Sequence, residues 1–206
     1  MIFPVQLHGR LQYQFRKLQV EQLAYVRYER IAERSRLLPI LDARVNAILQ
    51  ANASAKSKLG QFSQLADALA AEIAPDAGCR RGCAACCHIA VSVSSLEAAR
   101  LEHTLGLRAK KLSESHEPDD AKDLYFGTPC PFLEGSECSI YAHRPLSCRL
   151  HFTLDLDGYF CSTDIAPEDS RVPNVDLTAF WMGYAFLVLQ AGGLMGDIRD
   201  FFPAGR

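Results

Sequence analysis

The chain has 206 residues, of which 49% are hydrophobic and 22% are charged, and its formal net charge at pH 7 is −2. These values are ordinary for a globular protein, so a packed core is expected. With 22 basic and 24 acidic residues, the chain has no basic excess that would indicate nucleic-acid binding.

The first third of the chain is predicted to be helical. From residue 10 to residue 73, apolar residues recur at spacings of three and four, the period of an amphipathic helix. Pro39 should interrupt this run, because proline inside a helix removes a hydrogen bond and clashes with the preceding turn. A small polar loop is expected at 54–60, followed by a helix at 61–73 that ends before Pro75.

The middle of the chain contains a sequence signature for the start of a helix. Ser94 and Glu97 have the spacing of a capping box, in which each side chain accepts a backbone hydrogen bond from the other residue. A helix is therefore predicted at 95–105, with Gly106 as its stop. The polar, acidic segment 112–123 is predicted to be an exposed linker.

Two elements are predicted in the last third. Apolar and polar residues alternate around Asp157-Gly158, which predicts a β-hairpin over His151–Cys161. A final helix is expected over Asp176–Gln190, closed by two glycines. The sequence thus predicts a mainly α fold with a small irregular cysteine-rich metal core and a short β-hairpin. We expect a helical N-terminal extension at 1–74 and a cysteine-cluster domain with a C-terminal helix at 75–206.

The cysteines are concentrated in one part of the chain. All eight lie between Cys79 and Cys161. The N-terminus lacks the pattern of a secretory signal, and the longest apolar stretch is shorter than the roughly 20 residues that span a bilayer. We therefore expect a cytoplasmic protein without a membrane span. Cytosolic thiols stay reduced, so their clustering indicates metal binding or catalysis rather than disulfides.

The thiols form two groups along the sequence. The first group, Cys79 to Cys87, would bring its thiolates together whether its backbone is a helix or a loop. Thiolates this close together would repel one another without a cation. In the second group, prolines on both sides of Cys130 stiffen the backbone, which lowers the entropy lost on binding a metal. The predicted metal ligands are Cys79, Cys83, Cys86, Cys87, Cys130, Cys138, Cys148 and Cys161.

Counting thiols does not fix the nuclearity of the site. Cys86 and Cys87 are adjacent, and neighbouring side chains point in different directions, so both are not expected to ligate one mononuclear ion. Eight thiols suit two tetrahedral sites, or one four-iron cluster plus four other thiols. His88 and His151 are expected beside the metal or on the surface rather than as ligands. Arg144 and Arg149 either offset thiolate charge or form surface ion pairs.

The cysteine spacing resembles that of the YkgJ-like cysteine-cluster family, a zinc- or iron-chelating domain named for a CxxCxxCC motif. The first spacing in this chain is one residue longer than in that motif. The matching features are Cys79-x3-Cys83-x2-Cys86-Cys87, Pro129-Cys130-Pro131-Phe132-Leu133, Cys138-Ser139-Ile140-Tyr141, Arg144-Pro145 and Cys148-Arg149. The family includes proteins labelled iron–sulfur oxidoreductases, and flagellin lysine N-methylases carry a similar domain. The resemblance therefore implies metal binding but leaves the reaction open.

The leading hypothesis is a protein that binds iron as an iron–sulfur cluster, of the 4Fe-4S type, with redox or protein-modifying chemistry at or near it. Thiolate ligation suits Zn²⁺ as well. The alternatives are a zinc-stapled interaction module, whose N-terminal helices dock a protein partner, and an iron or zinc storage or delivery protein without catalysis. Methylation of a protein lysine is implied by the resemblance alone.

Overall fold

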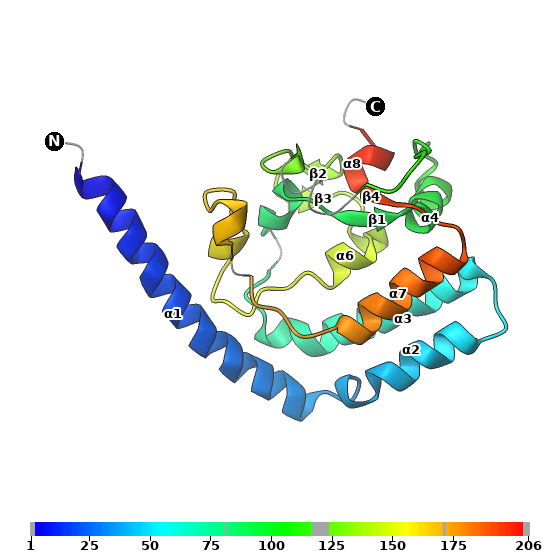
Figure 1. Ribbon diagram of the computed structural model, residues 1–206, viewed down its shortest axis with the longest axis horizontal. Coiled ribbons are helices and arrows are strands. Elements are labelled where there is room, and N and C mark those ends of the chain that lie inside the picture. Colours follow the sequence, from blue (N-terminus) through cyan, green and yellow to red (C-terminus); the bar gives the residue numbers. More distant parts are fainter. Residues whose placement is uncertain (1–2, 81, 117–123, 171, 204–206) are drawn as a thin grey trace.

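The computed structural model describes residues 3–80, 82–116, 124–170 and 172–203, and for residues 3–10 it describes only the backbone (Figure 1). The fold is mainly helical with little strand, as the sequence predicts. The α-helices are α1 (Phe3–Arg34), α2 (Leu41–Gln50), α3 (Ala55–Ile73), α4 (Ser95–Leu105), α6 (Leu146–Arg149), α7 (Thr178–Gln190) and α8 (Ile198–Phe201). The strands are β1 (Ser92–Ser94), β2 (Leu133–Glu134), β3 (Glu137–Cys138) and β4 (Met195–Asp197).

Helices α2, α3 and α7 pack side by side below the rest of the molecule in Figure 1. They bury the main hydrophobic core, in which the rings of Phe62 and Phe180 meet edge to face with centroids 5.3 Å apart. A Cβ at Gly183 would clash with a methyl group of Val45, so α7 approaches α2 closely because this position carries no side chain. Residues of α6 and of the segment that follows it complete this core.

The long helix α1 runs along one side of the molecule and continues beyond it at its N-terminal end (Figure 1). One face packs on the body through the buried side chains of Val20 and Ile31. The opposite face exposes Leu11, Phe15 and Leu18 to solvent. Helix α1 therefore has an apolar face that nothing in the described residues covers.

The helix boundaries confirm part of the sequence prediction. Pro39 lies in a short 3-10 helix between α1 and α2, so the predicted break is confirmed. The predicted loop at 54–60 is wrong, because the Ser54 hydroxyl accepts a hydrogen bond from the Ser57 amide and starts α3 at the next residue. The glycine in this segment lies inside α3, where a helix tolerates it at a modest cost in stability.

Strands β1 and β4 pair antiparallel, with Ser92 opposite Asp197, and they bring the C-terminal segment against the start of α4. The predicted capping box of Ser94 and Glu97 is confirmed, as is the stop at Gly106, which has a left-handed φ of 67°. A second hydrophobic cluster lies here, between α4, α8 and the loop around β2 and β3.

Two predictions for the last third are wrong in detail. His151–Cys161 is not a hairpin: the Asp157 carboxylate accepts from the Tyr159 amide, and the chain turns there into a short 3-10 helix, Tyr159–Cys161. The two-stranded hairpin near the site is β2–β3 instead. Helix α7 begins at Thr178 and is not the last element, since β4 and α8 follow it.

The acidic segment 112–123 is only partly described, and residues 117–123 lie outside the described residues. Of the rest, 113–116 is exposed as predicted, whereas Leu112 packs against the second hydrophobic cluster. Among the helices that the structure describes, none is both long and apolar enough to cross a membrane.

Candidate metal centre

All eight cysteines line one cavity of about 800 Å³ between the two hydrophobic clusters. None of them forms a disulfide. The cysteine-rich stretches that are far apart in the sequence therefore meet around a shared space. Their role as metal ligands remains a prediction.

The loop that carries the first four cysteines is held by a close backbone contact. The Gly78 amide donates to the Thr153 carbonyl at 2.8 Å, and a Cβ on Gly78 would clash with the Asp155 carbonyl oxygen. Glycine is required here because the two backbones touch. Farther along, the Cys87 amide donates to the Ala84 carbonyl at 2.9 Å within a short 3-10 helix, Ala85–His88.

Three cysteines of the later stretch line the cavity beside the second hydrophobic cluster. Cys130, Cys138 and Cys148 pack against the second hydrophobic cluster. Cys138 lies on β3 opposite Leu133, whose amide donates to the Cys130 carbonyl at 3.0 Å. Cys148 lies on α6. The Cys130 amide donates to the Cys87 carbonyl at 2.7 Å, and this hydrogen bond joins the two cysteine loops.

Burial makes most of these thiols hold their protons in the metal-free chain. Burial raises the pKa of Cys130 to about 11 and that of Cys161 to about 12, and it raises the pKa of Cys148 as well. Cys87 differs, because a hydrogen bond from the Cys86 thiol lowers its pKa to about 7. The same hydrogen bond and burial raise the pKa of Cys86. A metal ion must therefore displace protons from most of its ligands.

Two arginines supply positive charge beside the thiols. Arg144 lines the cavity, and its charge acts with that of Arg199 to lower the pKa of Cys87. Arg149 takes the second of the two roles that the sequence left open, because it forms an ion pair. Its guanidinium binds the Asp67 carboxylate and the Ala142 carbonyl, which gives it a structural role.

Arg199 on α8 makes contacts at the site that the sequence did not predict. Its side chain is 5% exposed and pairs with the buried carboxylate of Asp197 at 2.9 Å. The guanidinium also donates to carbonyls on both cysteine loops: Cys87, Ile89, Thr128 and Pro129. One side chain therefore ties the loop of Cys87 to the loop of Cys130. Nothing in the sequence signals this, because the carbonyl groups that Arg199 binds belong to segments 70 to 112 residues away.

The two histidines singled out in the sequence lie in different places. His151 lines the cavity, and its Nε2 has no hydrogen-bond partner among the described residues. Burial lowers its pKa, which favours the neutral ring. His88 follows the cysteine loop, and its Nδ1 lies 3.2 Å from the Ala84 carbonyl. The ring at position 151 is thus the one that faces the thiols.

The donor set fits a thiophilic metal, although the described side chains do not already surround an ion. Within the described part of the chain, no three Cys, His, Asp or Glu side chains are placed to hold one metal ion. The cavity has room for many water molecules, each of which takes about 30 Å³ in the liquid. Thiolate ligands suit zinc and iron–sulfur clusters, whereas Mg²⁺ and Ca²⁺ prefer oxygen. The cavity is therefore chemically suited to iron or zinc.

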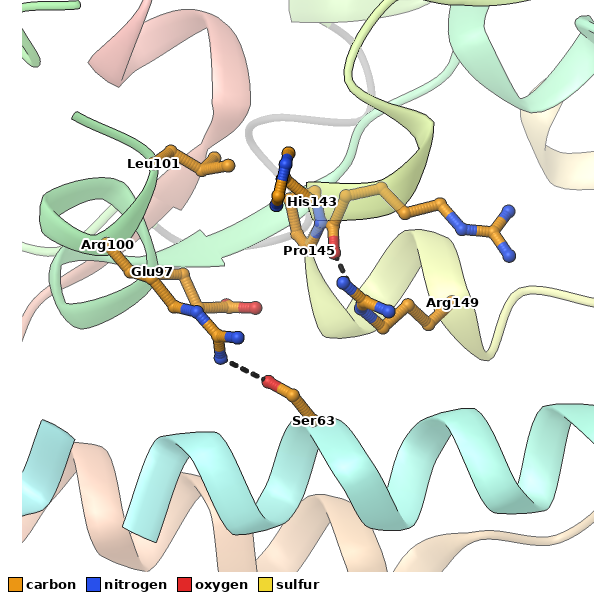
Figure 2. Close-up of a pocket in the computed structure, with 8 residues that line it drawn as sticks. Ser63, Glu97, Arg100, Leu101, His143, Pro145 and Arg149 are labelled. Carbon is orange, nitrogen blue, oxygen red and sulfur yellow. Dashed lines mark hydrogen bonds between the residues drawn. The ribbon is translucent and has the colours of Figure 1, made fainter. Parts of the chain in front are cut away.

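A second, much smaller cavity of about 20 Å³ lies near Glu97 (Figure 2). It has room for about one water molecule. Figure 2 shows Arg100 reaching down to the Ser63 hydroxyl on α3, at 2.6 Å. The Glu97 carboxylate accepts hydrogen bonds from the Leu146 amide at 2.8 Å and the Tyr184 hydroxyl at 2.5 Å. These contacts join α4, α6 and α7, so this pocket is a structural junction.

Residues 78–165 match the family model CxxCxxCC, described as a putative zinc- or iron-chelating domain. The family is the one that the cysteine spacing predicted. The match covers all eight cysteines and Arg144 but not Arg199, which lies on α8. No curated protein and no solved structure matches the chain. Residues 78–165 thus carry a domain of a type described as chelating zinc or iron.

Proposed function

We propose that this protein binds iron as an iron–sulfur cluster through the thiolates of the cavity and uses it in redox chemistry. The observation that carries the proposal is the convergence of eight free thiols on one cavity that is far larger than a single ion. A lone tetrahedral zinc ion binds sulfur at about 2.3 Å and needs four ligands drawn tightly together. Widely placed thiols around a large space suit a polynuclear cluster better.

The residues around the thiols also support a redox-active cluster. A bound cluster would supply one-electron transfer, and its potential depends on net charge, hydrogen bonds and solvent exposure. Arg144 and Arg199 place positive charge beside Cys87, which favours a centre that gains negative charge on reduction. Cys83 is exposed, so the cavity is accessible at that side to an electron donor or acceptor.

The test is to purify the full chain without oxygen and to measure iron, acid-labile sulfide and visible absorption. We expect a brown protein with iron and sulfide in equal amounts. A colourless protein with stoichiometric zinc would overturn the proposal. Cys83→Ala, which removes an exposed donor, should lower the metal content without unfolding the chain. Unchanged metal content in that variant would count against the first cysteine loop as a ligand source.

One observation favours a second function, a zinc-stapled interaction module. The outer face of α1 exposes Leu11, Phe15 and Leu18, at 64%, 62% and 65%, and an apolar helix face of this kind is typical of docking to another protein. In that case zinc would be bound in stoichiometric amounts, and a chelator would unfold the cysteine-rich part, because structural zinc contributes to folding.

A further inference from the structure

We propose that the outer face of α1 pairs with the same face of a second copy of this chain. The face is a seam of residues that recur at alternating spacings of four and three: Leu11, Phe15, Leu18, Gln22 and Tyr25. The inference goes beyond the proposed function, because it holds whichever metal the cavity binds. A second copy would also account for this exposed face without a further protein partner.

The two sides of α1 have different surroundings. On the inner side Val20 and Ile31 are buried, and Arg16 pairs with the Asp155 carboxylate at 2.8 Å. Side chains three and four positions apart share one side of a helix, so the seam residues lie on the side that faces away from these contacts. Figure 1 shows the described body of the molecule on one side of α1 only. A second long helix therefore has room to lie along the seam.

The spacing of the seam is that of a coiled coil. Two helices that wind around each other need apolar residues about every 3.5 positions, and the alternation of four and three from Leu11 to Tyr25 provides them. Gln22 is the polar exception, and a single polar residue in such a seam fixes the register of the pair. Glu29 occupies the next position in the series and ends the apolar run. The occupant that this pattern fits is another helix with the same repeat.

The residues beside the seam favour a second copy over a different protein. Glu and Lys at such flanking positions usually select the partner of a coiled coil through their charges. In this chain all the flanking residues but one are uncharged: Gln12, Gln14, Gln19, Glu21, Val26 and Tyr28. The flanks thus carry no charge pattern that would select an oppositely charged partner, and two identical faces meet little like-charge repulsion. A closed pair of identical faces is also the commonest form of oligomer.

The area of the seam and its flanks is sufficient for a stable pair. The large apolar side chains on this face are 37% to 65% exposed: Leu11, Phe15, Leu18, Tyr25, Val26 and Tyr28. A fully covered aromatic side chain buries about 150–250 Å², so covering these six would hide about 600 Å² of each chain. The pair would hide about 1,200 Å² in total, which exceeds the roughly 1,000 Å² expected of a biological interface. The outer face of α7 exposes fewer such side chains, namely Met182, Phe186 and Leu189.

The test measures the mass of the full-length reduced chain in solution by size exclusion with light scattering. We expect wild type to have twice the chain mass of 22.8 kDa. Leu18→Glu places a charge in the middle of the seam and should give a monomer with an unchanged far-UV circular dichroism spectrum. Leu189→Glu is the matched control, because it makes the same substitution at an exposed position of α7, and it should remain dimeric.

A charge exchange at Leu18 makes the test specific to this face. Leu18 is the central residue of the seam, so it faces its own counterpart when two seams overlap fully, in either helix direction. Leu18→Lys alone should therefore be monomeric, as Leu18→Glu is. An equal mixture of Leu18→Glu and Leu18→Lys should recover the dimer, because the opposite charges then meet.

Three results would contradict the pairing: a monomeric wild type, a Leu18→Glu variant that stays dimeric, and a Leu189→Glu variant that dissociates. If Leu18→Glu does not fold, Tyr25→Glu at the end of the seam replaces it, with the same expected result. The seam residues are not among those that line the cavity. The mass measurement and the metal analysis therefore test the two proposals independently.

Discussion

Replacing Arg199 with methionine tests whether one buried side chain holds the two cysteine loops in place. The substitution keeps length and apolar bulk but removes the charge and all side-chain donors. Two of the hydrogen bonds are short, at 2.6 Å to the Thr128 carbonyl and 2.9 Å to the Asp197 carboxylate. The other three, at 3.2 to 3.3 Å, are weaker. Most of the stability lost in Arg199→Met should therefore come from these two short hydrogen bonds.

The magnitude follows from the burial of Asp197, which is 1% exposed. A hydrogen bond to a charged group contributes about 1.5–3 kcal/mol, and removing one partner of a buried ion pair costs about 3–5 kcal/mol. These two figures describe overlapping effects, and Asp197 keeps bonds from the amides of Val91 and residue 199 itself. We therefore expect the free energy of unfolding of the metal-free chain to fall by about 3–5 kcal/mol.

The assay is urea unfolding of the metal-free chain, followed by circular dichroism, with chelator-driven metal release as a second readout. Arg100→Met is the matched control, since Arg100 is exposed and, within the part of the chain that the structure describes, its hydrogen bond goes to the Ser63 hydroxyl. The control should lower the free energy of unfolding by about 1 kcal/mol or less. In Arg199→Met, metal held by Cys87 and Cys130 should be released faster. A change of less than about 1 kcal/mol in Arg199→Met would refute the reasoning.

Four further predictions concern the stability of the chain and its binding of metal. Gly78→Ala should lower both stability and metal content, because its Cβ would clash with backbone atoms. Gly60→Ala, which has open space around it inside α3, should raise stability by about 0.5–1 kcal/mol. The melting temperatures of the two variants test both expectations. Arg16→Met should cost about 3 kcal/mol by removing the ion-pair partner of the buried Asp155 carboxylate, and an unchanged urea midpoint would contradict this. The metal-free chain should lose stability as the pH rises above 9. The reason is that the Cys130 thiol ionises at its ordinary pKa of 9.0 in the unfolded chain, whereas burial raises its pKa in the folded chain to about 11. A melting temperature that stays constant from pH 8 to pH 10.5 would argue against this. Metal affinity should instead fall as the pH falls, since binding displaces protons.

The helical parts of the fold were predictable where a local pattern specifies them. The capping box at Ser94 and the break at Pro39 depend on residues within one turn of each other, so the sequence contains the whole cause. The hairpin predicted at Asp157-Gly158 failed because long-range contacts decide this segment. Arg16 on α1 binds both Asp155 and Asp157, and these contacts hold the acidic residues in an irregular turn rather than a ladder.

The cysteine spacing by itself predicted the family model that residues 78–165 match and the donor chemistry of the cavity, because thiol type and clustering are properties of the chain. Only the tertiary structure brought the second group of thiols to the first around one cavity. Arg199 is the clearest case of what the sequence could not reveal. Its role depends on carbonyl groups, which every residue carries, and only folding determines which of them lie within its reach.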